Sequence, residues 1–590
     1  MTKEYSWRYM TLGLLFTALA AFIVLQMVRI QISPQAKFFR DRGNAVSGYW
    51  KTFFPARGPI YDRTGHLLAG NKTVYEVGVD LTHPAINPST IAMAVNAVVG
   101  VDYDYVFTLA NQSSSDDALY HIIADFVTEE EKIRLEQLRD EMFIAYADSD
   151  DVDRPNLEGL VFKPHLQRSY PDGKLAANLI GFVNREGRGF FGVEEQFDDL
   201  LAGDPQTIWV PADPNRVEEF PNIPPGASLV LTIDRTIQSK IEQILDNALN
   251  DTGAESGTIA IMDPKTGEII AMATTPRIDL NEYWRYSEVF IDPLMTYNNA
   301  ISKSYESGSV FKVFTMASAL DNKAVEPDTM FLDTGAFEIG GTVIHNWNGG
   351  AWGYQDMIGC MKHSLNVCLA WIASELGTGD FYEYMQAFGI GSLTGIELAG
   401  EVPGRLKLPG DNDWYEAELG TNAFGQGVSV TPVQMLMAVS AFANEGKMMT
   451  PRILFSMKKD GREYRTQPQI AGMPVSSETA RTISDMLAIS VEVESYSNAV
   501  VDGYRIAGKT GTGEIPTPFG YTSNVTNASF VGWGPVDDPQ FIVYVWLEKP
   551  QTSIWGSEVA APVFREVVED LVILMNIPPD DVRIQLLNSN

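Results

Sequence analysis

Apolar residues are most concentrated near the start of the chain, where Tyr9 to Val28 form a run of 20 residues without a charge. Arg8 and Arg29 bracket this run. At about 1.5 Å per residue, a helix of this length matches a hydrocarbon core of roughly 30 Å, so the pattern predicts a membrane-spanning helix. The alternative is a cleaved signal peptide, because Ala18-Leu19-Ala20 resembles a cleavage site. The apolar run continues eight residues beyond that site, which favours an uncleaved anchor.

The charges around the predicted anchor leave its orientation open. The positive-inside rule weighs the Lys and Arg residues close to the two ends of a membrane helix. Here the excess of Lys and Arg residues lies after the helix, which favours a cytoplasmic body. Two of these residues come before the helix, Lys3 and Arg8, and four come after it: Arg29, Lys37, Arg40 and Arg42.

The region after the anchor mixes short runs of strand character with glycine and proline. Between Asp102 and Glu158, sixteen acidic residues face four basic ones, which indicates a solvated surface. Thr128 to Leu138 opens with a capping threonine and first-turn glutamates, which predicts a surface helix. A turn-rich segment starts at Asn222 and precedes a strand pattern from Leu229 to Asp234, so we place a domain boundary at 225/226.

The rest of the chain has the pattern of one large domain. Two apolar runs, 257–262 and 268–273, are joined by the turn residues Asp263 to Gly267 and predict a β-hairpin. The further predicted elements are helices at 310–321, 360–375 and 432–444, strands at 527–533 and 540–547, and an amphipathic helix at about 560–575. Strands at both ends with helices between them predict an α+β fold whose sheet pairs the first and last segments.

Composition narrows the classes of function. The formal charge at pH 7 is 43 − 76 = −33, which argues against a partner such as nucleic acid. Hydrophobic residues make up 45% of the chain and charged residues 20%, so it can bury globular cores.

Cysteine and histidine offer little chemistry. On one helix, Cys360 and Cys368 would be roughly 12 Å apart, too far for a disulfide, and the sequence shows neither a disulfide framework nor a cysteine metal site. The six histidines show no short ligand spacing, so we expect no zinc: they are at 66, 83, 121, 165, 345 and 363. Any chemistry then comes from hydroxyls, amines or carboxylates.

The first candidate for chemistry is Ser309 with Lys312 at the start of an apolar helical pattern. This spacing places a hydroxyl and an amine on one face, so a neutral lysine could take the proton of an attacking serine. The alternative is a capping serine with a snorkelling lysine. The same spacing recurs at Ser456 and Lys459, but there a polar Lys-Lys-Asp-Gly-Arg stretch would keep the lysine hydrated and protonated.

The second candidate is Ser364-Leu365-Asn366, which begins 364 − 309 = 55 residues after Ser309. Ser364 could relay a proton, and the Asn366 amide could hydrogen-bond both a lysine and a substrate amide. A pairing of Ser364 with His363 is disfavoured, because adjacent side chains usually point apart.

The third candidate is Lys509-Thr510-Gly511-Thr512. A lysine and a threonine at a strand edge could hold a substrate carboxylate, and glycine lets substrate backbone approach closely. A second Lys-Thr-Gly, at 265–267, sits in the predicted hairpin turn, where this composition is ordinary. Its position before Ser309 favours the copy at 509.

Taken in order, these S-x-x-K, S-x-N and K-T-G motifs resemble those of the penicillin-recognising serine acyltransferases. Several other segments resemble the class B penicillin-binding proteins, so the resemblance runs from about residue 9 to 575: Arg57 to Ala69, Arg168 to Pro171, Ile180 to Val183, Gly192 to Asp198, Phe424 to Gln434 and Ala560 to Phe564. Asn527 to Pro535 and Leu547 to Pro550 look more like the cell-division type than the elongation type. One departure is Ser307, where the family commonly has proline.

The resemblance implies a transpeptidase fold, with an antiparallel sheet flanked by helices, on a β-rich pedestal that carries one membrane helix. It implies these parts: a cytoplasmic tail 1–8, an anchor 9–28, a pedestal 29–225, a transpeptidase domain 226–580 and a tail 581–590. It also implies an extracytoplasmic body, because long domains translocate largely regardless of flanking charge.

The function implied is a peptidoglycan D,D-transpeptidase that β-lactams acylate and that needs no cofactor. By resemblance, Ser309 is the nucleophile, Lys312 its base, Ser364 the proton donor to the leaving group, and Asn366 the residue that positions the donor amide. Lys509 and Thr510 would bind the terminal carboxylate, and Gly511 and Thr512 would complete the binding strand. The expected partners are stem peptides and a membrane glycan polymerase. The rivals are a scaffold that activates this polymerase, and a hydrolase such as a D,D-carboxypeptidase or β-lactamase.

Overall fold

The computed structural model describes residues 6–33, 36–37, 42, 48–114, 119–147, 154–211, 223–492, 498–517 and 520–589. The chain forms two compact units: residues 1–56 with 203–226, and residues 57–202 with 227–590. Lys3, Arg40 and Asn222 lie outside the described residues. The domain boundaries at 8/9, 28/29, 225/226 and 580/581 stay predictions.

The first unit holds the predicted anchor. Helix α1 runs from Ser6 to Ile32, and its segment Trp7–Ile30 is 24 residues long with a mean hydropathy of 2.2, long and apolar enough to cross a membrane. The hydroxyls of Thr11 and Thr17 donate to backbone carbonyls one turn earlier, which satisfies them within the helix. Strands β1 (Gly48–Phe53) and β8 (Gln206–Pro211) pair antiparallel in the same unit.

A seven-stranded sheet occupies one part of the second unit. Its strands are β2 (Ile60–Tyr61), β3 (Leu67–Asp80), β4 (Tyr120–Val127), β5 (Leu160–Ser169), β9 (Ser228–Leu231), β17 (Leu454–Lys459) and β18 (Arg462–Arg465). They follow the order β18-β17-β9-β2-β3-β4, and β5 pairs with β3. Strand β9 pairs with both β2 and β17, so segments from before and after residue 225 share this sheet.

Three helices cover the β3–β4–β5 end of this sheet: α3 (Pro88–Val99), α4 (Tyr103–Ala110) and α5 (Glu129–Ala145). Helix α5 begins at a capping box in which Thr128 and Glu131 bond each other's backbone amides. The predicted surface helix is therefore confirmed, because Leu135 is its one buried residue.

A buried ion cluster joins three segments that resemble the family's pedestal. The Glu194 carboxylate accepts from Arg57 Nε and Arg168 Nε, each at 2.7 Å, and Arg57 Nη1 also donates to Asp198 at 2.7 Å. Glu194 is fully buried, and both arginines are nearly so. Three stretches far apart in the sequence are thus tied together by paired charges.

The predicted hairpin and the predicted pairing of the domain's two ends are confirmed by a five-stranded antiparallel sheet of order β11-β10-β22-β21-β20. Its strands are β10 (Ser256–Met262), β11 (Ile269–Thr274), β20 (Ala507–Thr517), β21 (Gly520–Gly534) and β22 (Phe541–Glu548). Strand β10, from the start of the domain, lies beside β22, from its end. Strand β20 lies at the edge of this sheet, where an extended ligand can add.

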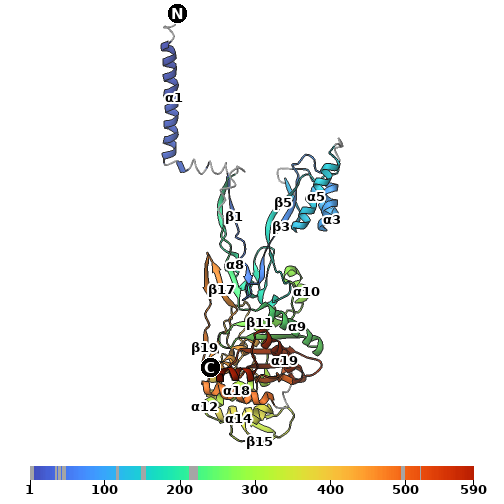
Figure 1. Cartoon of the computed structure of the whole chain (residues 1–590), viewed down its shortest axis with the longest axis vertical. Helices are drawn as coiled ribbons and strands as arrows, with labels where there is room; N and C mark the ends of the chain where they lie inside the picture. The colour runs from blue at the N-terminus through green and yellow to red at the C-terminus, as the bar shows by residue number, and fades with distance from the viewer. Residues whose placement is uncertain are drawn as a thin grey trace. The chain divides into compact units, whose positions relative to one another are not determined.

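Helices cover both faces of this sheet (Figure 1). On one face lie α9 (Arg235–Thr252) and α19 (Gly556–Leu574), which bury Ile259, Val545 and Phe530. On the other lie α12 (Lys312–Asn322), α14 (Asn366–Leu376), α17 (Pro432–Ala443) and α18 (Ser477–Glu492). The strands alternate between the two cores, since Ala260 and Tyr544 face the second group.

The predicted single helix over 360–375 is wrong, and so is the expectation that its two cysteines lie too far apart for a disulfide. Two helices, α13 (Met357–Lys362) and α14, are separated by a turn in which Ser364 has φ +52°. The turn brings Cys360 and Cys368 together, with 6.1 Å between their Cα atoms, and they form a disulfide. The estimate of 12 Å assumed an unbroken helix.

Short elements complete the second unit, in chain order: α6 (Ala177–Ile180), β6 (Phe182–Val183), β7 (Gly189–Phe190), α7 (Gly192–Gln196), α8 (Asp198–Ala202), η2 (Leu280–Arg285), α10 (Tyr286–Val289), α11 (Asn299–Ser302), η3 (Gly308–Phe311), β12 (Phe331–Asp333), β13 (Ala336–Ile339), β14 (Thr342–His345), β15 (Gly353–Gln355), α15 (Thr378–Ala387), α16 (Ala417–Asn422), β16 (Met448–Met449), β19 (Ile470–Gly472) and α20 (Asp580–Ser589).

Candidate active site

Ser309 lies on the short helix η3, one turn before Lys312 opens α12. Close packing fixes this turn, because a Cβ added at Gly308 (φ +58°) would lie 2.6 Å from the Thr512 carbonyl oxygen. On the other side, a Cβ at Gly425 would lie 2.2 Å from the Gly308 carbonyl oxygen. Glycines therefore let the serine turn lie between strand β20 and the loop at Gly425.

Lys312 is fully buried, and its ammonium group has three oxygen acceptors. Nζ donates to the Ser364 carbonyl oxygen at 2.6 Å, to Ser364 Oγ at 3.0 Å and to Asn366 Oδ1 at 2.7 Å. Burial, and next the positive charge of Lys509, hold the pKa of Lys312 well below its usual range. A lysine with a lowered pKa can be neutral at physiological pH and act as a base.

The turn between α13 and α14 presents Ser364 and Asn366 to the lysines. Ser364 Oγ accepts from Lys312 Nζ at 3.0 Å and from Lys509 Nζ at 3.1 Å, so one hydroxyl bridges two amines. Asn366 accepts from Lys312 and donates from Nδ2 to the His345 carbonyl oxygen at 3.2 Å. These contacts fix the orientation of the amide. The hydroxyl can pass a proton between an amine and a third group.

Strand β20 carries Lys509, Thr510, Gly511 and Thr512 at the sheet edge. Lys509 is fully buried, and its Nζ also donates to the Thr510 carbonyl oxygen at 3.2 Å and to Thr510 Oγ1 at 3.4 Å. A Cβ at Gly511 would lie 2.7 Å from the Ser307 carbonyl oxygen, so glycine lets this strand approach the serine turn. An ammonium and a hydroxyl side by side suit an anionic end group.

The structure thus brings four predicted residues together by direct hydrogen bonds: Lys312, Ser364, Asn366 and Lys509. Ser309 is adjacent in the chain, and Thr510, Gly511 and Thr512 belong to the same strand as Lys509. Within the described residues, no group of three or more His, Cys, Asp or Glu side chains could hold a metal ion.

Comparison with known proteins decides the family. The model of the penicillin binding protein transpeptidase domain matches residues 257–569, more than half of the chain, and that of the penicillin-binding protein dimerisation domain matches residues 52–217. The chain belongs to the penicillin-binding proteins. Together with the relatives below, the two domains place it in class B of that family, closest to the cell-division type.

Several curated relatives resemble the chain over most of their length. The stage V sporulation protein D of Bacillus subtilis is 31% identical over 539 residues, which cover 89% of this chain and 79% of the relative. The peptidoglycan D,D-transpeptidase FtsI of Buchnera aphidicola is 27% identical, covering 89% and 88%. The FtsI homolog of Mesostigma viride is 25% identical, covering 97% and 96%.

Solved penicillin-binding proteins share the fold, which confirms the predicted fold class. Penicillin binding protein 3 of Mycobacterium tuberculosis, in complex with aztreonam, has a TM-score of 0.68 at 24% identity and covers 90% of this chain and 98% of that one. Penicillin binding protein 2X of Streptococcus thermophilus has a TM-score of 0.73 at 22% identity, covering 89% and 80%.

The second copies of the S-x-x-K and K-T-G motifs in this penicillin-binding protein lie in different structural environments. Ser456 and Lys459 are on strand β17, where residues three apart point to opposite faces, so the hydroxyl and amine are not paired by their spacing. Lys265 lies in the β10–β11 turn and forms an ion pair with Asp538. The ring of His363 stacks on Trp352, 4.2 Å between centroids, while Ser364 bonds the two lysines.

Two aromatic residues near the site were missed by the sequence analysis. The rings of Trp347 and Trp555 meet edge to face, with centroids 5.4 Å apart. Trp347 donates to the carbonyl of His363, next to Ser364, and Trp555 precedes Gly556, whose amide donates to Thr512 Oγ1 at 3.1 Å. The pair thus links the Ser364 turn with strand β20, and no spacing in the sequence indicates it.

A cavity of 1020 Å³ adjoins the segment before Ser309. Glu306, Tyr521 and Trp546 are among its lining residues, as are Ile515 and Pro516 at the far end of β20. Burial raises the pKa of Glu306 above its usual value, and Tyr521 donates to its carboxylate at 3.0 Å. The cavity therefore continues the line of strand β20 away from Lys509.

Proposed function

We propose that this protein is a membrane-anchored serine D,D-transpeptidase that crosslinks peptidoglycan stem peptides through an acyl-enzyme and that β-lactams acylate the same serine. The observation that carries the proposal is the buried amine of Lys312, one turn from Ser309, held by Ser364 and Asn366 with Lys509 on the far side of the shared hydroxyl. The match to the penicillin binding protein transpeptidase domain supports transpeptidation as the reaction class.

In the first step, Ser309 Oγ attacks the carbonyl carbon between the two terminal D-alanines while the neutral amine of Lys312 accepts the hydroxyl proton. The carbon–nitrogen bond then breaks, and the proton reaches the leaving D-alanine amine through Ser364. In the second step, an acceptor amine attacks the ester and gives up a proton, and Ser309 regains its own. The atoms balance without a cofactor.

Substrate binding uses the neighbouring groups. The terminal carboxylate of the peptide docks on Lys509 and Thr510, and Asn366 positions the donor amide. The backbone amides of Ser309 and Thr512 form the oxyanion hole, a contribution of about 2.7–4 kcal/mol per donor. A peptide that adds antiparallel to β20 extends from Lys509 toward the cavity at Glu306, so the upstream part of the stem enters it.

The catalytic body lies outside the cytoplasm, on the far side of the α1 anchor. The charges around the anchor leave this orientation open, but the disulfide supports it, because disulfides persist in oxidising compartments and are rare in the cytosol. The anchor and pedestal would dock on a membrane glycan polymerase. Small residues on α1 permit close helix approach: Gly13, Ala18, Ala20 and Ala21.

The test of the reaction is the intact mass of the full-length protein, purified in detergent, after exposure to a fluorescent penicillin. Peptide mapping should place one adduct on Ser309, and Ser309→Ala should show none. An adduct on Ser456, or no adduct on a folded protein, would refute the assignment. A donor peptide incubated with and without an acceptor amine then separates a transpeptidase, which forms a crosslinked product, from a carboxypeptidase, which only releases D-alanine.

The partner is tested separately. Ser309→Ala should still co-purify with the polymerase and support glycan synthesis, but yield uncrosslinked strands. Replacing residues 1–30 by an unrelated membrane helix should weaken the association and leave penicillin acylation unchanged. Crosslinking by the Ser309→Ala variant, with no other transpeptidase present, would favour the scaffold function instead.

A further inference from the structure

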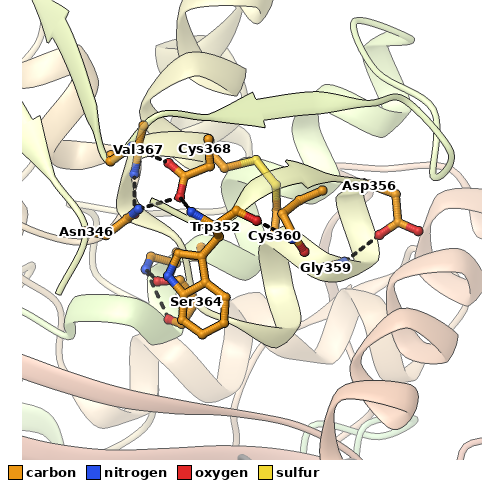
Figure 2. Close-up of a disulfide and its surroundings, with 12 residues drawn as sticks. Asn346, Trp352, Asp356, Gly359, Cys360, Ser364, Val367 and Cys368 are labelled. Atoms are coloured by element: carbon orange, nitrogen blue, oxygen red, sulfur yellow. Dashed lines mark hydrogen bonds between the residues drawn. A yellow bond between two sulfur atoms is a disulfide. The ribbon is translucent and has the colours of Figure 1, made fainter. Parts of the chain in front are cut away.

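The disulfide Cys360–Cys368 encloses the turn that carries two of the proposed active-site residues. Cys360 lies on α13 and Cys368 on α14, and both side chains are fully buried. Figure 2 shows the bridge joining the two helices, with Ser364 on the same turn. The chain between the cysteines contains Ser364 and Asn366, so the bridge closes a small loop around the groups that contact Lys312.

This turn has a conformation that serine rarely adopts. Ser364 has φ +52°, in the left-handed region that favours glycine, so its native conformation persists only where the surroundings enforce it. The backbone supports it through Leu365 N, which donates to the Cys360 carbonyl oxygen at 3.0 Å. That acceptor is the residue that carries the first half of the disulfide.

Side chains cap the first turn of each helix. Asp356 caps the start of α13 by accepting from Gly359 N at 2.7 Å. At the start of α14, Leu365 offers no side-chain cap, and Asn346 Oδ1 instead accepts from Val367 N at 3.2 Å (Figure 2). These caps act on one helix each. The disulfide is the covalent link that fixes the two helix ends against each other.

We propose that Cys360 and Cys368 are positioning residues for the transpeptidase reaction, whose bridge holds Ser364 Oγ and Asn366 Oδ1 on the amine of Lys312. This inference rests on the proposed function. The cysteines touch neither substrate nor reacting atoms, and they act through the Ser364 turn. Without the bridge, the turn relaxes from its left-handed conformation, the contacts to Lys312 lengthen, and water reaches the amine.

The experiment compares the full-length protein in detergent with its Cys360→Ala/Cys368→Ala variant, using the rate of acylation by a fluorescent penicillin per folded molecule. We expect the maximal acylation rate to fall about 10- to 100-fold, the range of a small misplacement near the chemistry, with little change in penicillin affinity. The matched control is Ile372→Val, a fully buried position on the same helix, which should leave the rate unchanged.

The pH profile separates positioning from lost stability. The charged group near the Lys312 amine is the Lys509 ammonium on β20, and its other neighbours are neutral oxygens of the Ser364 turn. Two titratable residues, Lys362 and His363, directly precede that turn. Water at the amine raises the pKa of Lys312, so the rising limb of the profile should move to higher pH in the cysteine variant. Mere loss of folded protein would leave the profile unmoved, because the rate is measured per folded molecule.

Further outcomes separate failure of the proposed function from failure of the positioning role. If the unchanged protein forms no acyl-enzyme, the proposed function fails, whatever the bridge does. If the unchanged protein reacts and the folded cysteine variant matches it in rate and pH profile, the positioning role is overturned while the function stands. Should the alanine pair not fold, Cys360→Ala/Cys368→Val refills the core, and the same comparison applies.

Reduction of the unchanged protein by dithiothreitol is a second test. Breaking the bridge should slow acylation, and reoxidation should restore the lost rate. If acylation does not slow although reduction of the bridge is verified, the proposal is overturned.

Discussion

The Glu194 ion cluster and the Lys312 site both contain buried charged side chains, and their charges are balanced in opposite ways. At the pedestal segments, Arg57 and Arg168 both contact the Glu194 carboxylate, with Asp198 beside them. At the candidate active site, the hydrogen-bond acceptors of Lys312 are neutral oxygens, and the nearest charge is another lysine. Burial is similar in both places, so the difference comes from the partners.

The pKa values follow these partners. Burial alone would lower the pKa of Arg57, but Glu194 and Asp198 together raise it above its usual value. Burial lowers the pKa of Lys312, and Lys509 lowers it further. Paired opposite charges therefore raise the pKa of Arg57 at the pedestal segments, whereas a neighbouring like charge lowers the pKa of Lys312, as the proposed proton transfer requires.

The largest expected effect is that of Lys312→Met, which keeps an unbranched apolar chain and removes the amine. Loss of a general base costs about 10²–10⁴-fold in rate, so penicillin acylation of Ser309 should fall by that range. Stopped-flow acylation of the full-length protein measures it. If this variant acylated normally and merely unfolded more easily, Lys312 would have a structural role like that of Glu194, and its assignment as the base would be wrong.

The same variant tests the balance of charge through stability. Because folding lowers the pKa of Lys312, the unfolded chain binds more protons than the folded one between the folded pKa and about 10.5. Stability thus falls as pH falls through that window. In urea unfolding at several pH values, Lys312→Met should lose this dependence and be the more stable protein at neutral pH.

The next effect is on stability at the other cluster. Glu194→Gln leaves two buried guanidinium groups without their shared charge, which should cost about 3–5 kcal/mol of unfolding free energy. Acylation per folded molecule should stay near normal. Glu195→Gln, the exposed neighbour, is the control. A small stability loss together with slow acylation would show that the two clusters do not divide these roles.

Lys509→Ala should have an intermediate effect. A hydrogen bond to a charged group contributes about 1.5–3 kcal/mol, so acylation should slow by roughly 10- to 150-fold. Removing the like charge also raises the pKa of Lys312, which moves the rising limb of the pH profile to higher pH. Lys265→Ala, in the other Lys-Thr-Gly, should change neither quantity. Equal effects of the two substitutions would mean that the binding strand was assigned wrongly.

The sequence predicted the parts of this molecule that depend on local pattern and on motif order. The helix of the apolar run, the capping box at Thr128 and the hairpin around Asp263 depend on local sequence alone, and the structure contains all three. The three motifs were recognisable because their order is specific. Their meeting at Lys312 depends on long-range packing, to which the sequence only pointed through resemblance.

The rest depended on three-dimensional context. No glycine or proline marks the break at Ser364, and the helical pattern of apolar residues continues through it. The sequence therefore predicted one unbroken helix, on which Cys360 and Cys368 would be too far apart for a disulfide. The Trp347–Trp555 pair joins residues 208 positions apart, 555 − 347, and only the fold places them together. The roles of the individual site residues stay predictions until the variants above are measured.

The smallest expected effect is on stability, from a substitution at Ser307 in the turn before Ser309. Ser307 departs from the proline that is common in the family, yet its φ of −73° is one that a proline ring adopts. Its Oγ is buried and, among the described residues, has no hydrogen-bond partner, so losing the hydroxyl costs little. Ser307→Pro should therefore raise the unfolding free energy by about 0.4–1 kcal/mol, because the unfolded chain loses freedom. Urea unfolding beside Ser307→Ala separates this entropic gain from the removal of the hydroxyl. Acylation should be unchanged, and a proline variant less stable than the alanine variant would show that the serine turn is not already in a proline-compatible shape.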